Sequence, residues 1–216
     1  KPNIKARVTT GWNKELSHDI TVEKVSISPF GNQIVLSERA ENTFSQFALR
    51  DENGRYLTVI PGATYGGNVL RKATNSFEFI GGRIDMTELT IIPIVSGDES
   101  DGQEAPKMVT VEFGTYPIYM PISKLGGFIL DSLEITTEKV VASFRQEGAV
   151  EVVNPNMMLL NEYGEYLDFA VFQDNNYNRE TGQITITQSL HDVSEEDLQQ
   201  IKKIGYFTRS QRLNED

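Results

Sequence analysis

The stretch Phe47-Ala-Leu-Arg-Asp-Glu-Asn-Gly-Arg-Tyr-Leu57 occurs a second time as Met157-Met-Leu-Leu-Asn-Glu-Tyr-Gly-Glu-Tyr-Leu167. The copies lie 110 residues apart and agree at five of eleven positions, where typical composition gives about one match by chance. In each copy, apolar residues alternate on both sides of a glycine, which is the pattern of a strand, a tight turn and a second strand. The repeat therefore predicts a chain built from two related units.

The turn of each copy has its own chemistry. Asn53-Gly54 predicts a two-residue type I′ turn, because both central positions of that turn need a positive φ. Tyr163-Gly164 keeps only the glycine, so a type I turn with a bulge is expected in the second copy. Two residues after each glycine stands a tyrosine, Tyr56 or Tyr166, and we expect its ring to pack into the core of its unit.

The elements around the repeated stretch recur in the same order. Alternating apolar residues predict strands on both sides of it, and polar, glycine-rich or amide-rich runs predict loops at 61–67 and 172–178. The strands expected in the first half are 20–27, 34–36, 76–80 and 90–94, and those in the second half are 128–135, 140–144, 183–187 and 205–207. Two further alternating runs, 108–113 and 118–122, lie near the middle of the chain.

A short helical element is expected before the last strand of each half. In the second half, Ser194 is a suitable N-cap, Asp197 stands where a capping box needs an acid, and Gly205 is expected to end the helix. In the first half the same pattern is compressed into about one turn at 85–89. The sequence thus predicts an all-β protein of two tandem immunoglobulin-like β-sandwich domains, each with a short helix near its C-terminal end.

The domain boundary is less sharply marked than the repeat. Residues 96–106 are polar and acidic without apolar periodicity, which is typical of an exposed loop. We place the first β-sandwich domain at 1–107 and the second at 108–216, with a boundary that can fall anywhere from 97 to 126.

Composition excludes several classes of protein. The chain has no cysteine, so disulfides, thiolate metal sites and a cysteine nucleophile are all excluded. Residues 1–97 carry 11 basic and 10 acidic residues, whereas residues 98–216 carry 9 and 21. Clustered carboxylates repel phosphate-rich surfaces, so nucleic acid and anionic membrane are poor partners. No apolar run is long enough to cross a bilayer, and the opening residues resemble the interior of a longer protein, so any anchor is expected upstream.

The sequence contains none of the common local motifs of enzymes. His18 and His191 stand in polar segments with no second histidine one helical turn away, and they are expected to be surface or capping residues. No Gly-x-Ser-x-Gly motif, dinucleotide fingerprint or phosphate loop occurs. The lone Trp12 is expected to close the end of a core. We therefore predict no enzymatic activity and no cofactor.

Two loops have the oxygen-rich composition of a calcium site. Asp98 and Asp101 lie close together, but their spacing departs from that of a calcium-binding loop. Asp174, Asn176 and Asn178 fall at the first, third and fifth positions of such a loop, although Arg179 replaces its glycine and Thr185 its bidentate glutamate. These five residues are weak calcium candidates, and a solvated loop is the main interpretation of both segments.

The run Asp19-Ile-Thr-Val-Glu-Lys-Val-Ser-Ile-Ser-Pro29, followed by the turn at 51–54, resembles a domain of unknown function in membrane proteins of Gram-positive bacteria. In those proteins the domain belongs to the C-terminal extracellular part, after a cytoplasmic segment and one transmembrane helix. Several are described as anti-sigma factors or as products of sigma-factor operons. The resemblance covers about residues 19–95 well and 128–207 more loosely. It implies a location and a broad role without catalytic residues.

Three hypotheses for function follow. The first is a non-catalytic extracytoplasmic sensing or binding module of a membrane-anchored regulator, with a protein or cell-envelope partner. The second is a structural or adhesive cell-surface spacer. The third is a domain that binds or acts on cell-wall polysaccharide, since carboxylate pairs for glycoside hydrolysis come from strands distant in sequence. The absence of cysteine fits a location outside the membrane of a Gram-positive bacterium.

Overall fold

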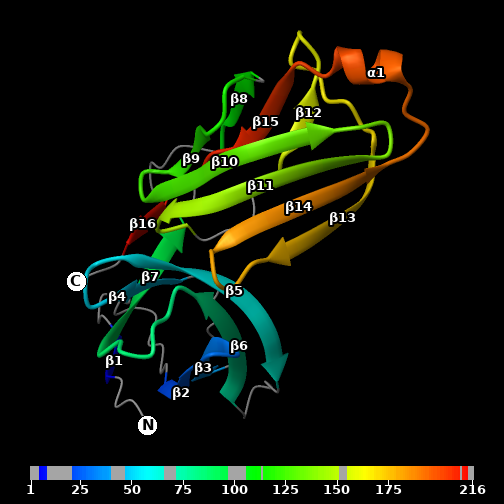
Figure 1. Cartoon of the computed structure of the whole chain (residues 1–216). Helices are drawn as coiled ribbons and strands as arrows, with labels where there is room; N and C mark the ends of the chain where they lie inside the picture. Colours follow the sequence, from blue (N-terminus) through cyan, green and yellow to red (C-terminus); the bar gives the residue numbers. More distant parts are fainter. Residues whose placement is uncertain are drawn as a thin grey trace. The chain divides into compact units, whose positions relative to one another are not determined.

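The computed structural model describes residues 5–8, 21–39, 47–65, 72–96, 106–112, 114–150, 155–209 and 211–213. Within these residues the secondary structure is almost entirely β, with one short helix (Figure 1). The expectation of an all-β chain is confirmed. The chain divides into two compact units: unit 1 comprises Lys1–Val95 together with Gln211–Asp216, and unit 2 comprises Ser96–Ser210.

Unit 1 is one curled sheet of eight strands (Figure 1). Its strands follow the order β1-β7-β4-β5-β6-β3-β2, and β16 also pairs with β7. Pairing is antiparallel between neighbours from β7 to β2, whereas β1 runs parallel to β7. The strands are β1 (Lys5–Val8), β2 (Thr21–Ser28), β3 (Gly31–Arg39), β4 (Phe47–Asp51), β5 (Tyr56–Tyr65), β6 (Lys72–Ile80), β7 (Glu88–Ser96) and β16 (Gln211–Leu213).

The long strand β5 lets this sheet curl around its own core. Its first residues pair with β4, and its remainder pairs with β6 across a register shift between Pro61 and Thr64. A bulge of this kind bends a strand and increases its twist. The curled sheet encloses an apolar cluster of Ile34, Leu36, Phe47, Leu49, Leu57, Phe77, Phe79, Met86, Leu89 and Ile91. Phe47 and Phe77 meet edge to face there, with ring centroids 4.8 Å apart.

Unit 2 contains a five-stranded and a three-stranded sheet, ordered β13-β14-β11-β10-β9 and β12-β15-β8. All pairs in both sheets are antiparallel. The strands are β8 (Met108–Glu112), β9 (Ile118–Ser123), β10 (Gly126–Ile135), β11 (Lys139–Gly148), β12 (Met158–Leu160), β13 (Ala170–Tyr177), β14 (Gln183–Leu190) and β15 (Lys203–Phe207).

One apolar cluster joins the two sheets of unit 2. Burial alternates along β14, as a period of two requires for a strand with one buried face. Phe128, Phe144 and Ile186 of the larger sheet share the cluster with Leu159, Ile204 and Tyr206 of the smaller one. The two sheets therefore pack in a sandwich-like manner, with the core between them.

The only helix in the described part of the chain, α1 (Glu195–Gln200), begins as the sequence predicts. The Ser194 hydroxyl accepts from the Asp197 N–H at 3.2 Å, and the Asp197 carboxylate accepts from the Ser194 N–H at 2.9 Å. This reciprocal pair is a capping box. The helix ends at Gln200 rather than at Gly205, because the fully buried Ile204 and its neighbours belong to β15.

The helix expected at 85–89 in the first half is absent, and that expectation is wrong. Residues 84 and 85 form a turn, and β7 begins at Glu88. One helical turn fixes several residues for a single hydrogen bond, so it forms only where other contacts favour it. Here Met86 and Leu89 are buried in the core without a helix, and Asp85 pairs with Arg83.

Two expected loops contain strand instead. Residues 61–65 belong to β5, and residues 172–177 belong to β13. Amide-rich runs usually favour turns, but here Gln173 and Asn175 lie on one side of β13 and are linked by side-chain hydrogen bonds. Gln188 donates to Gln173 at 3.3 Å and Gln173 donates to Asn175 at 3.1 Å. Tyr177, on the same side of the strand, packs against the core.

Candidate functional site

The turn between β4 and β5 is built around the carboxylate of Asp51. Its Oδ1 atom accepts from the backbone N–H groups of Asn53 at 3.0 Å and of Arg55 at 2.9 Å. The Asp51 N–H donates to the Arg55 carbonyl, and the Gly54 N–H donates to the Asp51 carbonyl. Gly54 has a φ of +81°, whereas Asn53 does not have a positive φ. The turn is thus a type I turn followed by a glycine bulge, and the expected type I′ turn is wrong.

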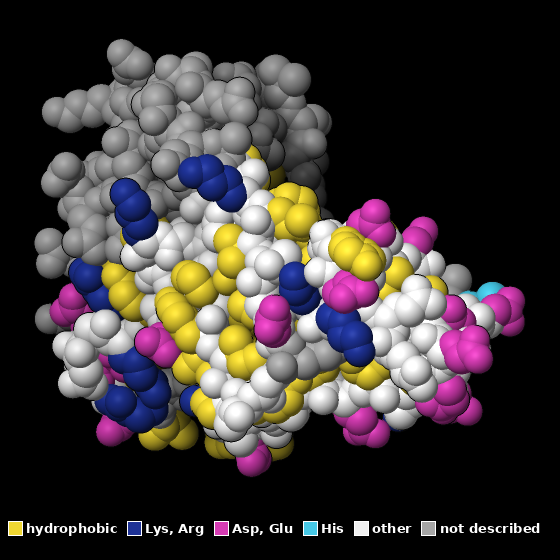
Figure 2. Space-filling model, turned by 90° about the horizontal axis from the view of Figure 1, so that it is seen from above, with side chains coloured by type: hydrophobic (Ala, Val, Ile, Leu, Met, Phe, Trp, Pro, Cys, Tyr) yellow, Lys and Arg dark blue, Asp and Glu magenta, His cyan; other side chains and the backbone are white. Residues whose placement is uncertain are grey.

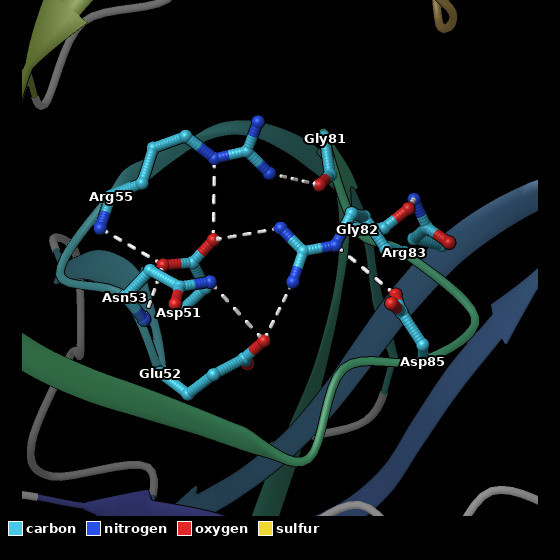
Figure 3. A network of polar contacts seen from close by, with 9 residues as sticks. Asp51, Glu52, Asn53, Arg55, Gly81, Gly82, Arg83 and Asp85 are labelled. Atoms are coloured by element: carbon cyan, nitrogen blue, oxygen red, sulfur yellow. Dashed lines mark hydrogen bonds and ion pairs between the residues drawn. The ribbon is translucent and has the colours of Figure 1, made fainter.

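Two arginines surround the same carboxylate (Figure 3). Arg55 Nε lies 3.2 Å from Asp51 Oδ2, and Arg83 Nη1 lies 3.9 Å from it. Arg83 also pairs with Glu52 at 2.7 Å and with Asp85 at 3.1 Å, while Arg55 Nη2 donates to the Gly81 carbonyl at 2.6 Å. This arrangement, the Asp51 network, ties the β4–β5 turn to the segment that precedes β7.

The Asp51 side chain is fully buried, whereas those of Arg55 and Arg83 are about half exposed. Burial raises the pKa of Asp51, but hydrogen bonds from the Arg55 and Asn53 backbone and the charge of Arg55 outweigh it, so the pKa lies below its ordinary value. Pairing with Asp85, assisted by Glu52 and Asp51, raises the pKa of Arg83. Asp51 is therefore a buried anion fixed between cations, which suits structural support better than proton transfer.

The second copy reproduces this turn in unit 2 with a neutral residue. Asn161 Oδ1 accepts from the backbone N–H groups of Tyr163 and Glu165, both at 2.9 Å. The Asn161 N–H donates to the Glu165 carbonyl, the Gly164 N–H donates to the Asn161 carbonyl, and Gly164 has the same φ of +81°. The predicted type I turn with a bulge is confirmed here, and the repeat is preserved bond by bond.

The side chains of this second turn, residues 161–168, differ from those of the first. Glu165 takes the place of Arg55, and its Oε2 accepts from Asn161 Nδ2 at 2.7 Å. Tyr163 takes the place of Asn53, and its side chain is 80% exposed. Tyr166, expected in the core, is 54% exposed, so that expectation is wrong. Lys203 donates to the backbone carbonyl of Glu162 at 3.0 Å.

Exposed apolar side chains are concentrated in unit 2. Figure 2 shows one face of the molecule on which hydrophobic side chains lie among acidic and basic ones. Among the described residues, the large hydrophobic side chains that are exposed in unit 1 are Phe30 and Ile84. Those exposed in unit 2 are Met108, Tyr119, Tyr163, Tyr166, Phe172 and Phe207.

The calcium candidates are only partly within the structure. Asp98 and Asp101 lie outside the described residues. Asp174 and Asn176 lie on the same exposed side of β13, opposite Thr187 and Thr185 of β14. Asn178 instead closes the β13–β14 turn, where its side-chain oxygen accepts from the Glu180 N–H at 3.0 Å and the Thr181 N–H at 3.1 Å. In the described part, no group of three or more potential ligands among His, Asp and Glu is placed to hold a metal ion.

The remaining candidates contribute little. Trp12 and His18 lie outside the described residues. His191 is exposed and lies 3.0 Å from Asp192. Within the described ranges, no helix has both the length and the apolarity required to span a membrane.

Sequence reasoning located both turns but missed what distinguishes them. The Asp51 network needs Arg83, which lies far along the chain and follows no motif. For Tyr163 the sequence does contain a signal: aligning the copies places Tyr163 opposite Asn53 and Glu165 opposite Arg55. The second turn therefore lacks the arginine of the first and has an aromatic side chain that the first lacks, so the two turns present different surfaces.

Comparison with known proteins yields one match. A family model described as a family of unknown function (DUF5643) matches residues 8–136. That match covers most of unit 1 and, in unit 2, extends through β8, β9 and β10. No curated protein and no solved structure matches the chain.

Proposed function

The chain belongs to the family of unknown function DUF5643, and we propose that it acts as a non-catalytic binding module of a membrane-anchored bacterial regulator of the anti-sigma-factor kind. Unit 2 is the half that meets the partner, which is a protein or another component of the cell envelope. Unit 1 is the supporting half.

The observation that carries this proposal is the set of exposed aromatic and apolar side chains on unit 2. Within the described residues, six large side chains of this kind are exposed in unit 2 and two in unit 1. Isolated exposed apolar residues are normal, whereas contiguous apolar patches mark interaction surfaces, and the exposed Phe207 stands opposite the exposed Met108 on the paired strands β15 and β8. Tyrosine and phenylalanine are enriched in protein interfaces and depleted elsewhere on surfaces. A spacer that only bridges a distance has no need of them.

A non-catalytic role is supported by the state of the polar groups. Among the residues that the structure describes, the one buried carboxylate with a perturbed pKa is Asp51, which is neutralised by Arg55 and serves as a hydrogen-bond acceptor for its own turn. Perturbed groups of enzymes instead stand in clefts and face a substrate. Asp131 is likewise bound to Arg145 by two contacts of 2.7 Å.

Photo-crosslinking in cells of the source organism tests the binding role. A photoreactive amino acid is placed at Tyr119, Phe172 or Phe207 in unit 2, and at Phe30 or Ile84 in unit 1 as a matched exposed control. We expect a discrete adduct from the unit 2 positions alone. No adduct from any position would favour the spacer, and adducts from unit 1 alone would show that the wrong half was chosen.

The location outside the cytoplasm rests on the resemblance of residues 19–29 and 51–54 to extracellular domains and on the lack of cysteine. Protease added to intact cells should remove this part of the parent protein. Resistance in intact cells together with cleavage after lysis would place it in the cytoplasm and remove the proposed role.

We further propose that both units are immunoglobulin-like domains arranged as a tandem repeat. The support is the repeated hairpin, whose hydrogen bonds agree between Asp51 and Asn161, and the face-to-face sheets of unit 2. An experimental structure of the chain tests it. Sheets with the immunoglobulin strand order in each unit are expected, and a different order in either unit would contradict the assignment.

A further inference from the structure

The two copies of the turn share one backbone and carry opposite surface chemistry. In unit 1, Glu52 is bound by Arg83, and Asp51 by Arg55 and Arg83. In unit 2 the position of Arg55 holds Glu165, which accepts a hydrogen bond from the neutral Asn161 amide. The first turn is thus neutralised within its own unit, whereas the second turn presents uncompensated carboxylates.

The surface of the second turn combines rings with negative charge. Tyr163 is the most exposed tyrosine of the described residues, and Tyr166 follows three residues later. Glu162, Glu165 and Asp168 are exposed beside them. The ammonium group of Lys203 donates to the backbone carbonyl of Glu162. Tyr166 lies 3.4 Å from Asp168 through its hydroxyl, so its ring face is not engaged by that contact.

A cationic group can interact with the tyrosine rings and with the carboxylates of this surface at the same time. Aromatic faces attract guanidinium and ammonium groups, and carboxylates form charge-assisted hydrogen bonds with them. The acidic excess of residues 98–216 attracts basic partners over a longer range and repels acidic ones. A surface on which tyrosines lie among carboxylates is therefore suited to bind a protein segment that carries arginine or lysine side chains.

We propose that the turn at residues 161–168 is the docking site of unit 2 for an arginine- or lysine-bearing segment of a partner protein. Tyr163 supplies the ring that meets the cation, and Glu162 and Glu165 supply the charge. This inference rests on the proposed function and names the partner class of that binding surface.

Unit 1 provides a variant that keeps the turn intact. Replacing Asn161→Asp, Tyr163→Asn and Glu165→Arg together installs the side chains that the same backbone carries at Asp51, Asn53 and Arg55. The matched control, Phe30→Asn with Glu180→Gln, also removes one exposed ring and one net negative charge, the ring from unit 1 and the charge from the β13–β14 turn. Tyr163→Phe retains the ring and tests whether the hydroxyl matters.

The whole chain is titrated with a capped peptide in which arginine and lysine alternate with glycine and serine, and with a counterpart carrying glutamate at the basic positions. Calorimetry measures affinity, and nitrogen-15 NMR locates shifted amides. We expect the basic peptide to bind with shifts centred on residues 162–166 and to weaken as salt rises from about 0.01 M to about 0.15 M. The triple variant should lose about tenfold in affinity, while the control and Tyr163→Phe remain near the parent.

Equal affinity of the triple variant and the parent for the basic peptide would overturn the assignment, and so would equal binding of the glutamate peptide or no binding of either. Crosslinking separates this failure from failure of the binding role itself. An adduct from Tyr119 or Phe207, found together with an unaffected triple variant, keeps the binding module and removes the turn as its docking site. Absence of an adduct from every position in both units removes the binding module.

Discussion

Asp51 and Asn161 occupy the same position of the repeated turn and accept the same two backbone N–H groups. They differ in charge, and each charge state fits its neighbours: Asp51 lies beside Arg55, and Asn161 beside Glu165. The shared acceptor oxygen fixes the turn, while the second atom of the side chain determines which charge the neighbouring position can hold. Substitutions at these two residues therefore separate geometry from charge.

We expect Asp51→Asn to cost unit 1 about 1 kcal/mol of its free energy of unfolding, and Asp51→Ala about 2–3 kcal/mol. Asparagine retains the oxygen that Asn53 and Arg55 donate to, as Asn161 does, whereas alanine leaves two N–H groups without their acceptor. Urea unfolding of the two variants measures the difference. Equal costs would contradict the separation of geometry from charge.

The Asp51 contribution also has a defined dependence on pH. Because the pKa of Asp51 is lower when folded than when unfolded, its stabilisation is complete above the ordinary value of 3.8 and is lost as pH falls through the folded pKa. The stability difference between the parent and Asp51→Asn should therefore shrink between about pH 5 and about pH 2. A difference that stays constant over this range would exclude the ionised carboxylate as its source.

The reverse substitution, Asn161→Asp, should destabilise unit 2 by about 1 kcal/mol at neutral pH. It places a carboxylate where the Asn161 amide now meets Glu165 at 2.7 Å, and like charges raise the pKa of both groups. The loss should therefore diminish as pH falls, and adding Glu165→Arg should restore stability at neutral pH. Unfolding curves that show no rescue by the second substitution would contradict this account.

At the scale of the element, both hairpins depend on a glycine in the left-handed region. Gly54 and Gly164 have φ of +81°, and no atom lies within 4 Å of a Cβ placed on either. A methyl group at either position would therefore strain only the backbone conformation. Gly54→Ala or Gly164→Ala should each lower the free energy of unfolding by about 1–2 kcal/mol. Gly114→Ala is the control, since its Cβ would also have room and its φ is not positive. Thermal unfolding should leave that control near the parent, and an equal loss there would refute a specific φ requirement.

The strands in which apolar and polar residues alternate were predicted well, for a physical reason. A strand with one buried face must place apolar residues two apart, so β2, β3, β10 and β14 follow directly from their residues. Local sequence patterns were misleading where tertiary contacts determine the secondary structure. The one-turn helix at 85–89 gave way to burial of Met86 and Leu89, and the amides of β13 satisfied one another instead of forming a loop.

The candidate site was predictable only in part. The repeat identified both turns, and the glycine in each was recognised. The Asp51 network was not predictable, because Arg83 reaches Asp51 only through the pairing that brings β4 and β7 together. The exposure of Tyr166 was also missed: a tyrosine in an alternating strand is usually turned inward, but this one forms only an isolated bridge with Leu160.

At the scale of the whole molecule, each unit has its own apolar cluster. Residues 96–210, expressed alone, should therefore fold with a β-type circular dichroism spectrum and a cooperative thermal transition. Deleting residues 211–216 from the whole chain should lower the stability of unit 1, since β16 pairs with β7, and leave that of unit 2 unchanged. An unfolded 96–210 fragment would show that the units fold only together.

The pairing of β7 has a mechanical consequence. Both β1 and β16 are hydrogen-bonded to β7, and all of unit 2 lies in the chain between β7 and β16. A pulling force applied between β1 and β16 therefore runs through the backbone of β7 and bypasses unit 2. Unit 2 bears tension only after one of these two strands has detached. While both strand pairs hold, unit 2 is therefore free of tension, and the load does not deform the surface that it carries.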